Sequence, residues 1–150
     1  MKLVLDASMA LAWFFTRQEI EEARCADAVL LAVADAKVWV PALWHTEIIN
    51  ALLVGERRQL VTKAQVMDYL NRLSMLPIMT DETAPMYRRD SVMSLARQYQ
   101  LTAYDATYLD MALNANAVLA TFDRKLADAM RAAGGIVFTP EMMSFEKEEN

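Results

Sequence analysis

The stretch TAYDATYLDMALNANAVLATFD, residues 102–123, holds the pattern that decides the fold. Thr102 can cap a helix that begins near Ala103 and runs to about Asn114. The apolar run Ala117–Ala120 that follows is too short for a helix and is typical of a buried central strand. Asp123 then opens another helix. A buried strand placed between two helices indicates a parallel α/β sheet.

The same alternation extends over the rest of the chain. Further strands are expected at residues 2–5, 38–40, 77–80 and 136–138. Helices are expected at residues 7–15, 19–34, 42–58, 62–76 and 83–99, with a capping box at Thr62 and Gln65 and a stop at Gly134 and Gly135. Neither a repeat nor a linker interrupts this pattern. We therefore predict one α/β domain over residues 1–140, a three-layer sandwich around a five-stranded parallel sheet.

The composition excludes several classes of protein and of site. Of the 150 residues 55% are hydrophobic, with only 3 Gly and 4 Pro, which argues against disordered and collagen-like chains. The single Cys25 and the single His45 exclude an internal disulfide and a metal site built from several cysteines or histidines. Any metal would need oxygen ligands. The sequence shows no signal-peptide pattern and no long apolar run, so we expect no membrane span and a cytoplasmic location.

The formal net charge of −5 is concentrated near the C-terminus. Residues 141–150 hold four Glu and one Lys, a net charge of −3, which leaves −2 for residues 1–140. A short charged run of this kind is typical of a solvated terminus, and we interpret 141–150 as an acidic tail. The acidic balance of the whole chain therefore does not exclude a nucleic-acid partner.

Three aspartates fall where the ligand-binding edge of such a sheet is expected. Asp6 follows the first strand, Asp123 comes shortly after the fourth, and Asp105 lies in the first turn of the helix that Thr102 caps. Each of them could simply cap a helix or interact with its dipole. Because the ends of the first and fourth strands of a parallel sheet are often neighbours, the three together favour a shared site.

Glu47 lies within an apolar stripe of the helix predicted at 42–58. Its neighbours one and two turns away are apolar, namely Leu43, Trp44, Ala51 and Val54. An ionised carboxylate in such a stripe needs a partner. That partner could be an arginine such as Arg57 or Arg58, or it could be a cation that Glu47 shares with the aspartates.

A site that contains all four acids requires a cation. Carboxylates a few ångströms apart repel one another by about 4 kcal/mol per pair at an effective dielectric constant of about 20. Mg²⁺ and Mn²⁺ prefer oxygen ligands, and in paired-metal sites they activate the attacking hydroxide and stabilise the leaving oxygen of a phosphodiester. The four acids therefore point to a metal-dependent nuclease.

Each acid lies in a distinct segment: LVLDAS at 3–8, WHTEIINAL at 44–52, TAYDATYL at 102–109 and LATFD at 119–123. In this order the segments resemble the four acidic motifs of PIN-domain ribonucleases, and most closely those of the VapC-type toxins of bacterial toxin–antitoxin pairs. The resemblance implies a sandwich with strand order 3-2-1-4-5, a Mg²⁺ or Mn²⁺ site, hydrolysis of RNA, a homodimer, and inhibition by a cognate antitoxin.

The resemblance also implies roles for individual residues. Those that would bind the metal and position the attacking water are Asp6, Glu47, Asp105 and Asp123. Ser8 and Thr121 match hydroxyl positions near that site. Asn50, one turn after Glu47, could orient the Glu47 carboxylate or could be a polar residue at the edge of the helix.

Basic residues near these motifs are candidates for contacts with RNA. If cations neutralise the four acids, the charge of residues 1–140 changes from −2 to about +2, which favours phosphate binding. The adjacent basic pairs are Arg124 with Lys125, Arg88 with Arg89, and Arg57 with Arg58. The first pair adjoins Asp123 and ranks highest, although any such pair could be a solvated helix face.

The predicted helices carry more apolar surface than a small domain needs. Trp13, Phe14 and Phe15 lie late in the first helix, Trp44 lies near the start of the third, and the chain has 11 Met. This excess suggests a homodimer interface or a groove for the antitoxin.

Other α/β proteins also place acids at strand ends. A phosphatase of the haloacid-dehalogenase type needs a second Asp where Ser8 stands, and Thr80 and Asp81 fit poorly as the phosphoacceptor region of a receiver domain. A partner-binding module without catalysis is the remaining alternative, and the four intact acids argue against it.

Overall fold

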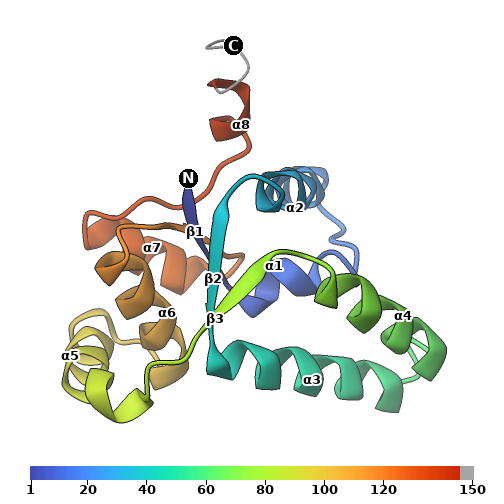
Figure 1. The fold of residues 1–150 in the computed structure, drawn as a ribbon, viewed down its shortest axis with the longest axis horizontal. Coiled ribbons are helices and arrows are strands. Elements are labelled where there is room, and N and C mark those ends of the chain that lie inside the picture. The colour runs from blue at the N-terminus through green and yellow to red at the C-terminus, as the bar shows by residue number, and fades with distance from the viewer. Residues whose placement is uncertain (146–150) are drawn as a thin grey trace.

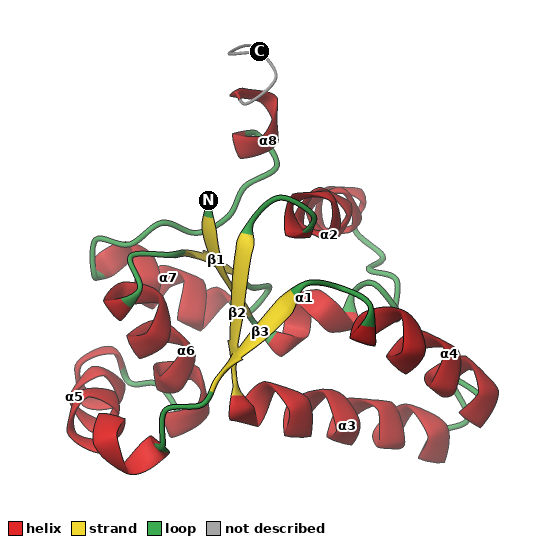
Figure 2. Cartoon of the chain, viewed as in Figure 1, coloured by secondary structure: helices red, strands yellow, loops and turns green. Residues whose placement is uncertain are grey.

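Four parallel strands form the sheet, in the order β3-β2-β1-β4 (Figures 1 and 2). The computed structural model describes residues 1–145. The strands are β1 (Lys2–Leu5), β2 (Lys37–Pro41), β3 (Ile78–Asp81) and β4 (Val118–Ala120). This arrangement confirms the predicted α/β class, the parallel sheet and the order of the first four strands.

The central position of β1 follows from its sequence. Leu3 pairs with Val38 of β2 on one side and with Val118 of β4 on the other. Both faces of β1 are covered, and its apolar residues, Leu3, Val4 and Leu5, are completely buried. A strand buried on both faces requires such an uninterrupted apolar run. Asp6 therefore stands at the point where the most buried strand ends.

Helices cover both faces of the sheet. Figure 1 shows α1 to α4 on one side and α5, α6 and α7 on the other. The elements on the first side are α1 (Ala7–Leu11), α2 (Ile20–Val33), α3 (Ala42–Arg57) and α4 (Lys63–Ser74). Those on the second are the 3₁₀ turn η1 (Pro85–Arg88), α5 (Arg89–Tyr99), α6 (Ala103–Asn114) and α7 (Arg124–Ala132). Among the described residues, no helix is both long enough and apolar enough to cross a membrane.

The predicted fifth strand at 136–138 does not form as a strand. Val137 makes only an isolated parallel bridge with Leu119, so the sheet of the described residues has four strands. The chain enters this segment through Gly134, whose φ is +84°, and leaves it at Pro140, which has no N–H to donate. The pairing consists of two backbone hydrogen bonds, from the Leu119 N–H to the Ile136 carbonyl at 2.9 Å and from the Phe138 N–H to the Leu119 carbonyl at 2.8 Å.

The helix predicted at 7–15 is also too long, because α1 ends at Leu11. The aromatic residues that follow turn inward: the indole N–H of Trp13 donates to the Ala26 carbonyl at 3.0 Å, and Phe14 stacks on Tyr69 with ring centroids 4.8 Å apart. Phe15 packs against the core and Trp44 is only 3% exposed. Trp44 is therefore buried within the protomer, and Trp13, Phe14 and Phe15 are partly buried there, so much of the apolar surface that the sequence suggested for a partner packs against the core.

The predicted acidic tail, residues 141–150, contains a short helix in its first half. Residues Met142–Phe145 form α8, which stands at the end of the molecule farthest from α3 in Figure 1. Met142 and Met143 are partly buried against the core. The rest of the tail, residues 146–150, lies outside the described residues.

The packing of α4 on α1 yields a test of the fold. Tyr69 is 7% exposed, and its hydroxyl donates to the Ala10 carbonyl at 2.7 Å. Tyr69→Phe should lower the free energy of unfolding by about 1 kcal/mol, the net value of one buried hydrogen bond. Denaturant titration measures this, with Tyr87→Phe as the control because Tyr87 is 79% exposed. Equal stability of the two variants would show that the Tyr69 contact contributes nothing.

Candidate active site

Asp6 joins the carboxyl ends of β1 and β4. Its backbone N–H donates to the Ala120 carbonyl at 3.0 Å, which continues the ladder between the two strands by one bond. Its carboxylate is buried, with 4% of the residue exposed. One oxygen, Oδ2, accepts hydrogen bonds from the Ser8 hydroxyl at 2.7 Å and from the Thr121 hydroxyl at 2.6 Å. The two predicted hydroxyl residues therefore both contact the first predicted acid.

The same two hydroxyls also shape the loop after β4. Ser8 Oγ accepts the backbone N–H of Phe122 at 3.0 Å, and Thr121 Oγ1 accepts the backbone N–H of Asp123 at 3.0 Å. Each hydroxyl thus donates to the carboxylate and accepts from the loop. This arrangement brings Asp123 to the same edge of the sheet as Asp6.

The capping explanation of the aspartates holds for one of the three. Asp123 caps α7, because its Oδ1 accepts the backbone N–H of Leu126 at 2.8 Å. Asp6 occupies the N-cap position of α1 but makes no capping hydrogen bond with its side chain. At the start of α6 the cap is Thr102, whose hydroxyl accepts the backbone N–H of Asp105 at 3.2 Å. Helix capping therefore does not account for the carboxylates of Asp6 and Asp105. Asp105 lies in the first turn of α6, where its charge interacts favourably with the helix dipole.

Glu47 lies beside the buried face of α3, next to Trp44 and Ile48, and is itself half-buried. Its Oε1 accepts a hydrogen bond from the hydroxyl of Tyr108 at 2.8 Å. None of the ion pairs found among residues 1–145 joins Glu47 to Arg57 or Arg58. The partner of the Glu47 carboxylate within the protein is thus the phenol of Tyr108 on α6. Tyr108 was not predicted as a site residue, although it follows Asp105 by one helical turn.

Neighbouring acids affect the pKa of Asp6, Glu47 and Asp105. Burial, followed by the charges of Asp123 and Asp6, raises the pKa of Asp105 to about 6. Burial is also the main cause that raises the pKa of Asp6, with a smaller contribution from Asp123. The pKa of Glu47 is raised by burial, and the charges of Asp6 and Asp105 add to this effect while the Tyr108 hydrogen bond opposes it. Charges act on a pKa in this way over short distances, so Asp6, Glu47 and Asp105 face one region together with Asp123.

The donor set of this region fits a hard divalent cation. All four groups are carboxylates, and none of them takes part in an ion pair among the described residues. In residues 1–145 no three His, Cys, Asp or Glu side chains stand close enough to hold one ion directly. Mg²⁺ usually keeps several waters and binds through one or two carboxylates, so it does not require such a direct cluster.

The predicted secondary contacts lie at different distances from the acids. Arg124 and Lys125 are exposed at the start of α7, and the charge of Lys125 lowers the pKa of Asp105, which places Lys125 near the site. Arg89 is exposed at the start of α5. Asn50 is exposed, and within the described part of the chain it makes no hydrogen bond to Glu47. The contact that orients Glu47 comes from Tyr108.

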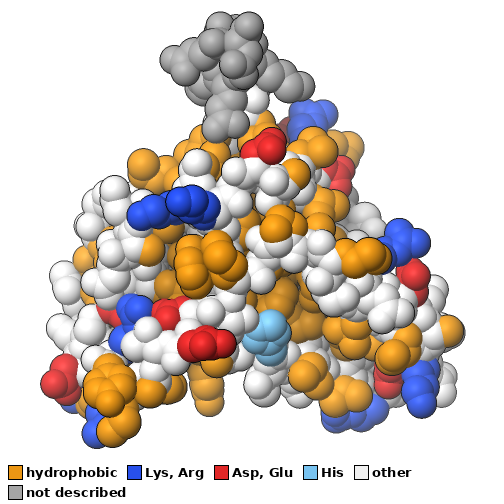
Figure 3. Space-filling view, viewed as in Figure 1, with side chains coloured by type: hydrophobic (Ala, Val, Ile, Leu, Met, Phe, Trp, Pro, Cys, Tyr) orange, Lys and Arg blue, Asp and Glu red, His pale blue; other side chains and the backbone are white. Residues whose placement is uncertain are grey.

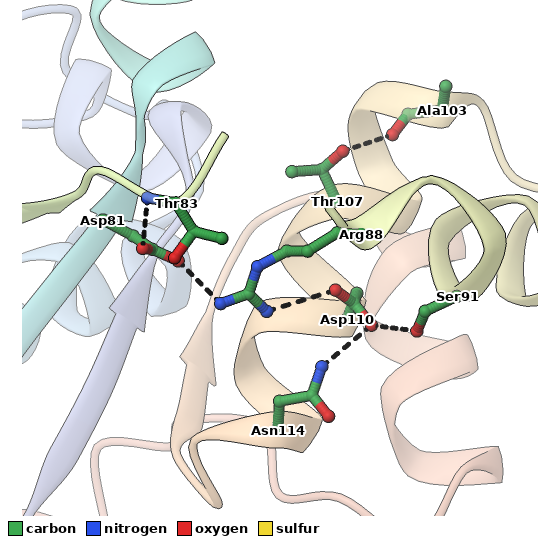
Figure 4. Close-up of polar contacts among 8 residues, drawn as sticks. All are labelled: Asp81, Thr83, Arg88, Ser91, Ala103, Thr107, Asp110 and Asn114. Carbon is green, nitrogen blue, oxygen red and sulfur yellow. Dashed lines mark hydrogen bonds and ion pairs between the residues drawn. The ribbon is translucent and has the colours of Figure 1, made fainter. Parts of the chain in front are cut away.

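Arg88 belongs to a separate network between β3, η1 and α6 (Figure 4). Its guanidinium donates to Asp81 at 2.8 Å and to Asp110 at 3.3 Å. Asp110 is 2% exposed and also accepts hydrogen bonds from the Asn114 amide at 2.9 Å and from the Ser91 hydroxyl. Two carboxylates already engage the charge of Arg88, so its position fits a structural link better than the predicted contact with RNA. The sequence signal for the Arg88–Asp110 pair was the position of Asp110 among the apolar residues of the buried face of α6.

The raised pKa of Asp105 predicts how metal-free stability depends on pH. The folded protein holds this proton more tightly than the unfolded chain, whose Asp has a pKa near 3.8. The stabilisation is therefore complete below pH 4 and is lost as the pH rises through 6. Asp105→Asn should accordingly raise the melting temperature in chelator at pH 7.5, and this advantage should disappear at pH 4.

Asp128→Asn is the matched control, because Asp128 is an exposed acid of α7 that pairs with Arg131 at 3.5 Å. It should show no comparable dependence on pH. An Asp105→Asn variant whose difference from wild type is the same at both pH values would contradict the electrostatic argument.

Comparison with solved structures supports the fold. PAE2754 from Pyrobaculum aerophilum matches with a TM-score of 0.67 and 24% identity, over 100% of this chain and 91% of that chain. VapBC2 from Rickettsia felis, solved bound to a DNA fragment from their promoter, matches with a TM-score of 0.64 and 15% identity over 93% and 98% of the two chains. FitAcB from Neisseria gonorrhoeae matches with a TM-score of 0.60 and 18% identity over 92% and 97%.

No curated protein sequence matches the chain. A family model does: the model of the PIN domain matches residues 3–132, a range that includes all four acids. PIN domains are generally nucleases. The acids at the ends of β1 and β4, the parallel sheet and this match lead to one conclusion, that the chain belongs to the PIN domain family.

Proposed function

We propose that the protein is a Mg²⁺- or Mn²⁺-dependent endoribonuclease and acts as the toxin of a VapC-type toxin–antitoxin pair. The observation that carries this proposal is the gathering of four carboxylates from separate parts of the fold. Asp6 follows β1, Glu47 lies on α3, Asp105 on α6, and Asp123 caps α7. Burial and neighbouring acids raise the pKa of Asp6, Glu47 and Asp105, which costs stability when these groups are ionised, so their clustering favours a function.

The cation would be held among Asp6, Glu47, Asp105 and Asp123, directly by one or two of these carboxylates and through water by the others. When bound, Mg²⁺ or Mn²⁺ supplies the positive charge that activates an attacking water and stabilises the leaving oxygen of a phosphodiester. The protein itself fixes the geometry. Ser8 and Thr121 hold the Asp6 carboxylate in one orientation, and the cap at α7 fixes Asp123. These contacts are made by the protein's own residues, so they preorganise the site.

The substrate would bind across this edge through its phosphates. Arg124 and Lys125 follow Asp123 directly and are exposed, which suits contact with a phosphodiester backbone. Arg89 is a more distant candidate for the same role. RNA is preferred over DNA as the substrate because the four motifs resemble those of ribonucleases.

Two protein partners are part of the proposal, a cognate antitoxin and a second copy of the chain. Solved structures of similar fold include VapBC2 and FitAcB. A mostly apolar pocket of about 430 Å³ opens between the starts of α3 and α6 and the segment η1–α5. Large apolar side chains around it are exposed, notably Met86, Met93 and Tyr104. Figure 3 shows that hydrophobic side chains, interspersed with polar ones, are exposed over much of the face in view. Such surface suits a protein partner.

Cleavage of RNA tests the catalytic part of the proposal. The purified protein should cleave RNA with Mg²⁺ or Mn²⁺ and should be inactive in excess chelator. Each of the substitutions Asp6→Asn, Glu47→Gln, Asp105→Asn and Asp123→Asn should lower the rate by about 100-fold or more, because each removes a charged metal ligand. A gel assay on RNA, with DNA of the same sequence as a parallel substrate, gives the rates.

Asp128→Asn provides the control for loss of one negative charge on α7 and should leave the rate unchanged. Circular dichroism should show that all variants are folded. Cleavage that persists in chelator, or four variants as active as wild type, would refute the nuclease. Inactive wild-type protein under all metal conditions would favour the non-catalytic binding module.

Expression in a bacterial host tests the biological role. Wild-type protein alone should arrest growth, and co-expression of the small protein encoded beside its gene should relieve the arrest. The antitoxin is expected to cover apolar helix surface and to direct a basic side chain to the acids. Growth curves measure the effect. Arrest of equal strength by the Asp6→Asn variant would show that toxicity has another cause.

A further inference from the structure

Tyr108 of α6 contacts one of the predicted acids, Glu47 of α3, through a hydrogen bond. Among residues 1–145 it is the only side chain of α6 that forms a hydrogen bond with α3. It follows Asp105 by three residues, so the two side chains project from the same side of α6. Asp105 faces the acid cluster, and the Tyr108 hydroxyl reaches Glu47 Oε1 at 2.8 Å. One helix therefore contributes both an acid of the site and a donor to a second acid.

The ring of Tyr108 is fixed in place. It is 0% exposed and is among the largest fully buried side chains of the protein. In a close-packed interior such a ring has no room to change rotamer, so its hydroxyl is a donor with a fixed position. Glu47, in contrast, is half-buried and has a long, flexible side chain.

The neighbouring acids repel the Glu47 carboxylate and so favour its rotation away from the site. The charges of Asp6 and Asp105 both act on its carboxylate unfavourably. Without an attractive contact, rotation toward solvent would relieve this repulsion. The bond from Tyr108 opposes that rotation, because a hydrogen bond to an ionised acceptor is stronger than one between neutral groups.

We propose that Tyr108 is a positioning residue, whose hydroxyl holds the Glu47 carboxylate beside Asp6 and Asp105 so that the acids bind the divalent cation together. This inference rests on the proposed function. A buried phenol generally needs a hydrogen-bond partner, and any acceptor would serve if the phenol had only a structural role. Tyr69 shows that a backbone carbonyl suffices for it in this protein. Tyr108 instead uses an acid of the site.

The test compares two substitutions of the same chemistry. Tyr108→Phe and Tyr69→Phe each remove one buried hydroxyl and keep the ring. Binding of Mn²⁺ to the purified protein is measured by electron paramagnetic resonance titration, and folding is followed by thermal melting. Tyr108→Phe should weaken Mn²⁺ binding by about 10-fold, a typical loss when a partner of a metal ligand is removed. Tyr69→Phe should lower stability but leave Mn²⁺ binding unchanged.

A double substitution shows whether Tyr108 acts through Glu47. In the Glu47→Gln background, which binds Mn²⁺ more weakly, Tyr108→Phe should cause little further loss. Wild-type affinity in Tyr108→Phe would overturn the inference, and so would an equal loss in both backgrounds. A wild-type protein that binds no Mn²⁺ would overturn the metal site itself, and the role of Tyr108 with it.

A measurement on the wild-type protein does not depend on how the variants fold. The buried hydroxyl proton of Tyr108 should give a slowly exchanging proton resonance that shifts when Mg²⁺ is added, because Glu47 then shares its charge with the cation. The hydroxyl proton of Tyr69, which donates to a backbone carbonyl, should not shift. Binding of Mg²⁺ that leaves the Tyr108 resonance unchanged would contradict the inference.

Discussion

The buried carboxylate of Asp6, held by the hydroxyls of Ser8 and Thr121, is the contact on which the arrangement of the site depends. Burial of an ionised carboxylate is unfavourable unless hydrogen bonds compensate for lost water. Here the two donors come from α1 and from the loop after β4, which are more than 110 residues apart in the chain. The same hydroxyls accept the backbone N–H groups of Phe122 and Asp123. The two hydroxyls that hydrogen-bond to Asp6 therefore also fix the position of Asp123.

The clustering of the acids that suits a metal site lowers the stability of the fold around them. Burial and neighbouring charge raise the pKa of Asp6, Glu47 and Asp105, which means that the ionised forms are unfavourable in the metal-free fold. The core offsets this strain: three of the four residues of β1 and six of the twelve residues of α6 are buried, and these elements supply the rigid base from which Asp6 and Asp105 project. A cation bound only to the folded state would add stability by mass action.

The sequence predicted those features that depend on local pattern. The strand that ends at Asp6, the cap of α6 at Thr102 and the cap of α7 at Asp123 follow from apolar runs and capping residues, and the structure contains all three. The fifth strand failed because a three-residue apolar run does not reveal whether a neighbour will pair along its length. The helix at 7–15 failed because Trp13 gains a hydrogen bond to the Ala26 carbonyl, a contact that no local pattern contains.

The contacts that sequence reasoning missed are those between α6 and other elements. On one side, Tyr108 donates to Glu47 of α3; on another, Asp110 accepts from Arg88 of η1 and from Ser91 of α5. A helical wheel shows only that a phenol and an acid lie among apolar residues, and the identity of the partner depends on how α3 and α5 pack. Both contacts are polar, short and largely buried, so each has a definite geometry. Helix α6 is thus fixed to α3 and to the segment η1–α5 at once. The position of Asp105, which no side chain of the described residues neutralises by an ion pair, follows from these two attachments and from the cap at Thr102.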